Sequence, residues 1–88
     1  MITLTLYSRP GCHLCDDMKA IVHRVARSIP VTIDLVDITT DAQLEARYGL
    51  EIPVLLIDGR KAAKYRVSED ELLRILIARA GAAGEAGG

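Results

Sequence analysis

The chain has 88 residues, half of them hydrophobic, and a formal net charge of −1 at pH 7. A chain of this length forms one domain that buries about 60% of its unfolded surface, so its hydrophobic core is modest. The balanced charge argues against binding to nucleic acid or to a membrane surface, since both require a basic patch. No apolar run is long enough to cross a membrane and no secretory signal is recognisable, so we expect a cytoplasmic location. We also expect the chain to be a monomer.

The first half of the chain has the pattern of a β-α-β unit. Residues 2–7 alternate between apolar and polar side chains, which predicts a strand. From Leu14 onward apolar residues recur at helical spacing, and Pro30 places the end of this helix near Ser28. Residues 31–38 are rich in β-branched side chains and predict a second strand, which the helical crossover should make parallel to the first.

A short helix follows the second strand. The sequence Thr40-Asp41-Ala42-Gln43 is a capping-box pattern, which predicts that a helix opens there and continues through Tyr48. Gly49 suits the left-handed position just past the end of that helix.

The second half of the chain predicts a hairpin and a last helix. The continuous apolar run of residues 54–57 fits a strand buried on both faces, and Asp58-Gly59 predicts a tight turn into a polar edge strand over residues 60–66. A second capping box, Ser68-Glu69-Asp70-Glu71, opens the last helix. Residues 81–88 are rich in Gly and Ala and are expected to form a flexible tail beyond a domain of residues 1–80.

The predicted element order is therefore β-α-β-α-β-β-α. This order is accommodated by an α/β fold with a four-stranded mixed sheet and helices on both faces of the sheet.

Both cysteines of the chain, Cys12 and Cys15, lie where the first strand pattern ends and the first helical pattern begins. The first N–H groups of a helix lack intrahelical partners and carry partial positive charge, so a thiolate there is stabilised and its pKa falls. The two cysteines are roughly one helical turn apart, close enough to form a disulfide. We therefore predict a dithiol site in which Cys12 attacks a disulfide and Cys15 resolves the mixed disulfide.

Other interpretations of this pair stay open. Structural zinc takes four ligands, and His13 and His23 are too poorly placed on the same helix to complete a site, so we predict no metal ligands within one chain. The metal alternative is a homodimer that holds an iron–sulfur cluster through Cys12 of each chain. A third alternative is a redox-inactive domain that keeps the fold for partner binding.

Charged neighbours can tune the cysteines. His13 either favours the thiolate of Cys12 through its partial positive charge or is a loop residue that faces water, whereas Asp16 and Asp17 oppose the thiolate. Arg9 either steers an anionic thiol substrate toward the site or is a solvated loop charge.

With its elements in this order, residues 2–79 resemble the glutaredoxin branch of the thioredoxin-like superfamily. The motif Tyr-Ser-Arg-Pro-Gly-Cys-His-Leu-Cys-Asp at residues 7–16, Ile52-Pro53 before the third strand, and the Asp58-Gly59 hairpin carry the resemblance. It implies a thioredoxin-like fold and a small thiol-disulfide oxidoreductase that reduces protein disulfides or glutathione mixed disulfides. It also implies that the Ile52–Pro53 bond is cis and lies beside the cysteines, where its backbone can pair with an extended substrate segment.

Two departures from this family concern glutathione. The family's Gly-Gly-x-Asp-Asp stretch before the last helix is replaced here by Tyr-Arg-Val-Ser-Glu-Asp at residues 65–70, and Leu14 replaces an aromatic residue before the second cysteine. Arg9, in contrast, matches the basic residue that the family places three positions before the first cysteine. We therefore expect no bound cofactor, and an electron donor that is either glutathione or a reductase of the thioredoxin-reductase kind.

Overall fold

The computed structural model describes residues 2–87, with side chains described for residues 2–79. The helices and strands follow in the predicted order, with one short 3-10 turn, η1, that the sequence did not predict. Their bounds are β1 Ile2–Ser8, α1 His13–Ala26, β2 Val31–Asp37, η1 Ile38–Thr40, α2 Ala42–Tyr48, β3 Val54–Ile57, β4 Arg60–Lys64 and α3 Glu69–Gly87. The flexible tail expected at residues 81–88 stays a prediction. The side chains beyond residue 79 and the whole of residue 88 lie outside the described part.

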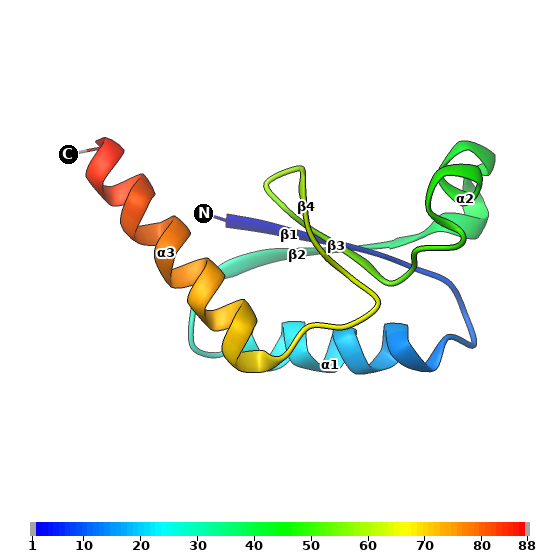
Figure 1. The fold of residues 1–88 in the computed structure, drawn as a ribbon, viewed down its shortest axis with the longest axis horizontal. Helices are drawn as coiled ribbons and strands as arrows, with labels where there is room; N and C mark the ends of the chain where they lie inside the picture. The colour runs from blue at the N-terminus through cyan, green and yellow to red at the C-terminus, as the bar shows by residue number, and fades with distance from the viewer. Residues whose placement is uncertain (1, 88) are drawn as a thin grey trace.

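The four strands form one mixed sheet in the order β2-β1-β3-β4. The strands β1 and β2 pair in parallel, as the helical crossover between them predicts, whereas β3 is antiparallel to both β1 and β4. The polar strand β4 lies at one edge of the sheet, as expected. Figure 1 shows that the start of α1 and the connection from α2 to β3 lie at the same end of the sheet.

The main core lies between the sheet and the pair α1 and α3. Alternate residues of the central strands face this side, because successive side chains of a strand point to opposite faces. The buried residues that meet there are Leu4, Leu6, Met18, Val22, Val25, Leu55, Ile57, Val67, Leu72 and Leu76. These residues are aliphatic apart from one methionine, as a chain without Phe or Trp requires.

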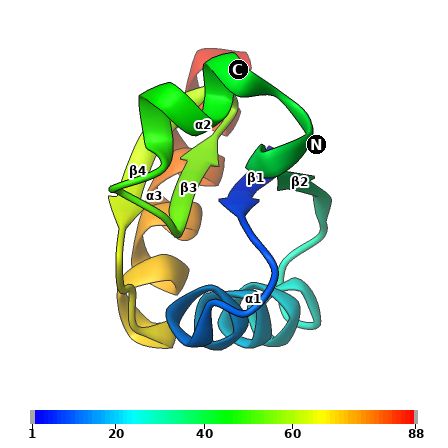
Figure 2. The same cartoon turned by 90° about the vertical axis from the view of Figure 1, so that its right-hand side faces the viewer.

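A smaller cluster covers the opposite face of the sheet. The buried residues Val54 and Leu56 of β3 pack there against Tyr48 of α2. Tyr7 packs against the same cluster, with its ring centroid 4.7 Å from that of Tyr48. Figure 2 shows α1 below the sheet and α2 above it. The predictions of helices on both faces, and of a third strand buried on both faces, are therefore confirmed.

The start of α2 differs from the predicted capping box. The N-cap is Asp41, whose Oδ1 accepts from the N–H groups of Gln43 and Leu44, at 2.8 and 3.3 Å. Thr40 belongs instead to η1, where its hydroxyl donates to the carbonyl of Asp37. A carboxylate one residue later thus satisfies the free N–H groups that the threonine was expected to bind.

The prediction of a left-handed Gly49 is wrong. Its backbone is right-handed, with φ −54° and ψ −30°. The need for glycine is steric instead, because a Cβ at this position would lie 2.5 Å from the carbonyl oxygen of Glu45.

Two further boundaries depend on local backbone geometry. The strand β4 ends at Lys64, two residues before the predicted end, because Tyr65 has φ +68° and leaves the extended conformation. The predicted cap of α3 is confirmed, since Ser68 Oγ accepts from the N–H of Glu71 at 3.0 Å. In the described residues, no helix is both long enough and apolar enough to cross a membrane.

Candidate functional site

Cys12 is the N-cap residue of α1. Its backbone is extended, with φ −97° and ψ 111°, and its Sγ accepts a hydrogen bond from the N–H of Cys15 at 3.2 Å. Gly11, with φ +78°, turns the chain sharply into the helix, in a conformation that glycine adopts at no steric cost. The sulfur of Cys12 is therefore placed at the positive end of α1, as the sequence predicts.

Cys12 and Cys15 are joined in a disulfide, with their Cα atoms 5.2 Å apart. The two cysteines differ in exposure, because Cys12 is half-buried whereas Cys15 is only 1% exposed. Solvent therefore reaches Cys12 more readily than it reaches Cys15.

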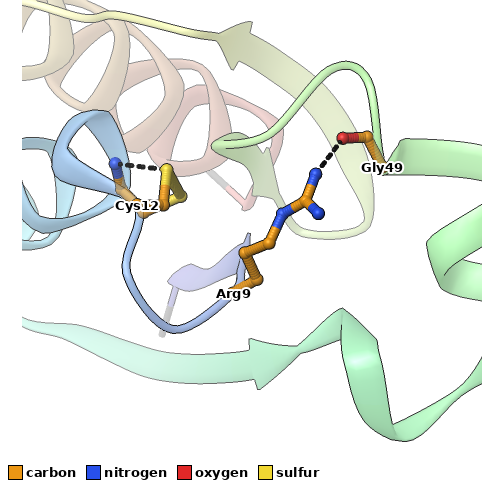
Figure 3. The surroundings of a disulfide bond; sticks show 4 residues. Arg9, Cys12 and Gly49 are labelled. Carbon is orange, nitrogen blue, oxygen red and sulfur yellow. Dashed lines mark hydrogen bonds between the residues drawn. A yellow bond between two sulfur atoms is a disulfide. The ribbon is translucent and has the colours of Figure 1, made fainter.

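Arg9 connects the loop that carries the dithiol to the loop before β3. Its Nη2 donates to the carbonyl oxygen of Gly49 at 2.6 Å, although the side chain is otherwise exposed. Figure 3 shows this guanidinium reaching from the cysteine loop to Gly49. Arg9 thus fixes the relative position of two loops, a role that the sequence did not predict, and keeps its positive charge in solvent.

His13 is the first residue of α1 and is exposed. Its side chain makes no hydrogen bond or ion pair with the described residues. Its effect on the thiolate of Cys12 stays a prediction.

The Ile52–Pro53 peptide bond is cis, as the resemblance implies. The backbone around it is already partly paired: the N–H of Ile52 donates to the carbonyl of Tyr48, and the carbonyl of Pro53 accepts from the N–H of Tyr65. Within the described part of the chain, the carbonyl of Ile52 has no partner. This carbonyl is therefore an acceptor that no described group uses.

The loop before Pro53 is anchored on its other side by Glu51. Its carboxylate accepts from Lys61 Nζ at 2.9 Å and lies 3.6 Å from Lys64 Nζ. The hydrogen bond from Lys61, helped by the charges of both lysines, lowers the pKa of Glu51 below its ordinary value. The carboxylate therefore stays ionised and holds the loop to β4 through the neutral pH range.

Tyr65 is the residue of this region for which the sequence offered no functional argument. It adopts a left-handed backbone, donates its hydroxyl to the carbonyl of Leu50 at 3.2 Å, and has Lys64 Nζ 5.4 Å from its ring centroid. Because a tyrosine seldom adopts a positive φ, nothing in the sequence predicted this backbone conformation at Tyr65. Leu50 itself is 93% exposed.

A cavity of about 480 Å³ lies between α1 and the connection from β4 to α3. Leu14, which directly precedes Cys15 in the motif, and Tyr65 both line this cavity. In the described residues, no group of three or more His, Cys, Asp or Glu side chains could hold a metal ion.

Comparison with known proteins assigns the family. Residues 3–76 match the model of the family described as Glutaredoxin-like domain (DUF836). The chain belongs to this family. The glutaredoxin-like match covers both cysteines and all four strands except Ile2 of β1, so it includes the whole dithiol site described above.

Relatives and solved structures agree with this assignment. A Dictyostelium discoideum protein, named Glutaredoxin-like protein YDR286C homolog, is 32% identical over 77 residues, which cover 81% of this chain and 71% of that protein. The X-ray structure of a structural-genomics target, XcR50 from X. campestris, is 38% identical, with a TM-score of 0.71 over 85% of this chain and 96% of that one.

A thioredoxin from Halobacterium salinarum is 21% identical, with a TM-score of 0.61, and covers 84% of this chain and 70% of its own. At this identity the likeness shows the fold alone. The fold of this glutaredoxin-like chain is thus thioredoxin-like, as the sequence predicts.

Proposed function

We propose that this glutaredoxin-like chain is a thiol-disulfide oxidoreductase in which Cys12 attacks and Cys15 resolves. The observation that carries the proposal is the asymmetry of the pair: half-buried Cys12 caps α1 and is disulfide-bonded to Cys15, a residue that is only 1% exposed. The free N–H groups at a helix start favour the thiolate over the thiol, and the thiolate is the nucleophilic form of cysteine.

The exchange proceeds in two balanced steps. The Cys12 thiolate attacks one sulfur of a substrate disulfide, forms a mixed disulfide, and releases the other substrate sulfur as a thiolate. Cys15 then loses its proton and attacks the Cys12 sulfur, which forms the Cys12–Cys15 disulfide and releases the second substrate thiolate. Two electrons pass from the protein dithiol to the substrate disulfide.

The carbonyl of Ile52 provides a place for the substrate backbone. It has no partner in the described residues, and Arg9 holds its loop to the cysteine loop through Gly49. An extended segment next to the substrate disulfide can donate a backbone N–H to this carbonyl, which would hold the disulfide near Cys12. This pairing requires a substrate with a peptide backbone, so it favours protein disulfides and glutathione mixed disulfides over small synthetic ones.

The oxidised chain needs an electron donor to complete a cycle. Glutathione and a reductase of the thioredoxin-reductase kind are the two donors that we propose. Turnover should be measured with glutathione and glutathione reductase in one arm and with thioredoxin reductase in the other, at equal protein concentration. Activity in one arm alone identifies the donor.

The proposed roles of the two cysteines are tested by replacing each one. The reduced wild-type chain should reduce the disulfides of insulin, and Cys12→Ser should lose this activity completely. Cys15→Ser should still attack but should accumulate a mixed disulfide with the substrate, which mass spectrometry detects. Insulin reduction by Cys12→Ser at the wild-type rate would refute the assignment.

Alkylation gives a test that needs no substrate. Because Cys15 is buried and Cys12 is half-buried, a limiting amount of iodoacetamide should modify Cys12 first in the reduced chain. Equal modification of both cysteines, or preferential modification of Cys15, would contradict the proposed roles.

A further inference from the structure

The two edges of the sheet differ in how well they are protected against the addition of another strand. Figure 2 shows β2 and β4 on opposite sides of the sheet, as the strand order requires. The strand β4 is protected, because its register against β3 shifts between Leu55 and Leu56 and because Lys61 and Lys64 are exposed on it. The strand β2 pairs with β1 in an unbroken register over all seven of its residues and contains no Lys, Arg or Pro. The edge that can accept another strand is therefore β2.

The backbone groups on the open edge of β2 can be assigned from the ladder. The N–H of Thr3 donates to Asp58 Oδ1 and the carbonyl of Thr3 accepts from the N–H of Asp58, both at 2.9 Å, so both groups of Thr3 point toward β3. Successive residues of a strand point these groups to opposite edges, so those of Leu4 point toward β2. Leu4 is the partner of Ile33, and in a parallel ladder it bonds to the two residues that flank Ile33. The N–H and carbonyl groups of Ile33 and, two residues later, of Leu35 therefore point away from β1, and no described group pairs with them.

The side chains along this edge are acidic and apolar. Leu35 is 45% exposed, and Asp34 beside it is exposed and has no hydrogen bond or ion pair with any residue that the structure describes. Asp37 and Asp41 are already used, because they cap η1 and α2. Residues 28–46 contain acidic residues but no Lys or Arg. The edge thus combines free backbone groups, an exposed leucine and a carboxylate that lacks a counterion.

We propose that the β2 edge binds an extended segment of a partner protein, with apolar residues at alternate positions and Lys or Arg between them. The backbone of the segment bonds to the outward groups of Ile33 and Leu35, which adds a fifth strand to the sheet. Because successive side chains of a strand point to opposite faces, an apolar residue of the segment covers Leu35 while a basic residue lies opposite Asp34. A second copy of this chain fits less well, since its β2 brings another Asp34 and no cation.

The test uses the oxidised full-length chain and the peptide acetyl-Val-Lys-Val-Lys-Val-Lys-Val-amide, and it measures amide hydrogen exchange by NMR. In the free chain the amides of Asp34 and Val36 should exchange slowly, since they bond to β1, whereas those of Ile33 and Leu35 should exchange fast. Saturating peptide should slow Ile33 and Leu35 by about tenfold, as expected for one net hydrogen bond each. Unchanged exchange at these two amides would overturn the proposal.

Two control peptides separate the pattern from the charge. Acetyl-Lys-Lys-Lys-Val-Val-Val-Val-amide has the same composition without alternation, and a third peptide has Glu in place of each Lys. Both should bind more weakly than the alternating basic peptide, and equal affinity of all three would overturn the proposal. Protection of Ile33 and Leu35 without peptide, rising with protein concentration, would show that a second copy occupies the edge and would overturn it as well.

Three variants locate the site. Leu35→Pro removes one outward N–H and leaves the ladder with β1 intact, a change that edge strands tolerate, and it should weaken binding by about tenfold. Asp34→Asn should weaken binding by about threefold, as for one exposed ion pair. Asp70→Asn, the matched control, makes the same change at an exposed aspartate on α3 and should leave the affinity unchanged.

Equal effects of the two Asn variants would overturn the proposed site, and so would wild-type affinity in a folded Leu35→Pro chain. Circular dichroism establishes that each variant is folded, and if Leu35→Pro is not, Asp34→Asn and the control peptides decide the question. Peptide binding involves no electron transfer, so its failure leaves the proposed dithiol exchange untouched.

Discussion

The hydrogen bond between Cys12 Sγ and the N–H of Cys15 makes one residue both the attacking sulfur and the cap of α1. Two substitutions at Cys12 separate these roles. Both remove the sulfur, but a serine hydroxyl can still accept from a helix N–H, whereas an alanine cannot. Cys12→Ser should therefore keep the cap and Cys12→Ala should lose it.

The size of this difference follows from the cap geometry. The Sγ–N distance is 3.2 Å, and α1 supplies three buried residues to the main core, Met18, Val22 and Val25. Loss of an N-cap side chain costs typically about 1 kcal/mol. For a domain of this size, that difference corresponds to roughly 4–8 °C in the midpoint of thermal unfolding.

The assay compares the two variants under identical reducing conditions. Neither can form the disulfide, and both retain the Cys15 thiol, so the cap is the only intended difference. Urea denaturation followed by circular dichroism gives the free energy of unfolding, and insulin reduction gives the activity. Cys12→Ala should be less stable than Cys12→Ser by about 1 kcal/mol, and both should be inactive.

Equal stability of the two variants would show that the side chain at this position does not cap the helix. Activity in Cys12→Ser would show that the sulfur of Cys12 is not the nucleophile. Either result would remove the physical basis of the proposed site.

Three further predictions concern the fold. Leu55 is fully buried, so Leu55→Ala should lower the free energy of unfolding by about 2–5 kcal/mol in urea denaturation, and a loss near zero would contradict this packing. Gly49→Ala would bring a Cβ within 2.5 Å of the Glu45 carbonyl oxygen and should cost about 1–3 kcal/mol in the same assay, whereas unchanged stability would contradict that steric reason. Hydrogen bonds from the backbone N–H of Thr3 and from Arg79 lower the pKa of Asp58 in the folded chain, so its contribution is present above the ordinary pKa of 3.8 and is lost as pH falls through the lower folded value. Asp58→Asn should therefore flatten the acid limb of stability against pH, and superimposable wild-type and variant curves would rule this out.

Much of the fold could be predicted because local sequence patterns were strong. The strand alternation at residues 2–7, the helical periodicity after Leu14 and the apolar run at residues 54–57 each fixed an element and the faces that it buries. The pair of cysteines at a strand-to-helix boundary predicted the dithiol, because the electrostatics of a helix start depend only on the local chain. Two of the predictions that failed, at Thr40 and Gly49, concerned how the chain is arranged at the ends of α2.

Contacts between distant segments could not be predicted from the sequence. Arg9 bonds to Gly49, 40 residues away, and Tyr65 bonds to Leu50, 15 residues away. Neither bond has a local pattern, because each depends on how two loops meet once the sheet has formed.

The amino-acid sequence by itself determined the four strands, the three α-helices and the place of Cys12 at the start of a helix, since these follow from periodicity, caps and turn residues along the chain. Only the tertiary structure decided that Cys15 is buried while Cys12 is half-buried, and that Tyr65 and Arg66 line the same cavity as Leu14 of the motif. Burial and loop-to-loop distance arise from packing α1 against the sheet and the connection after β4, and no local pattern contains that information.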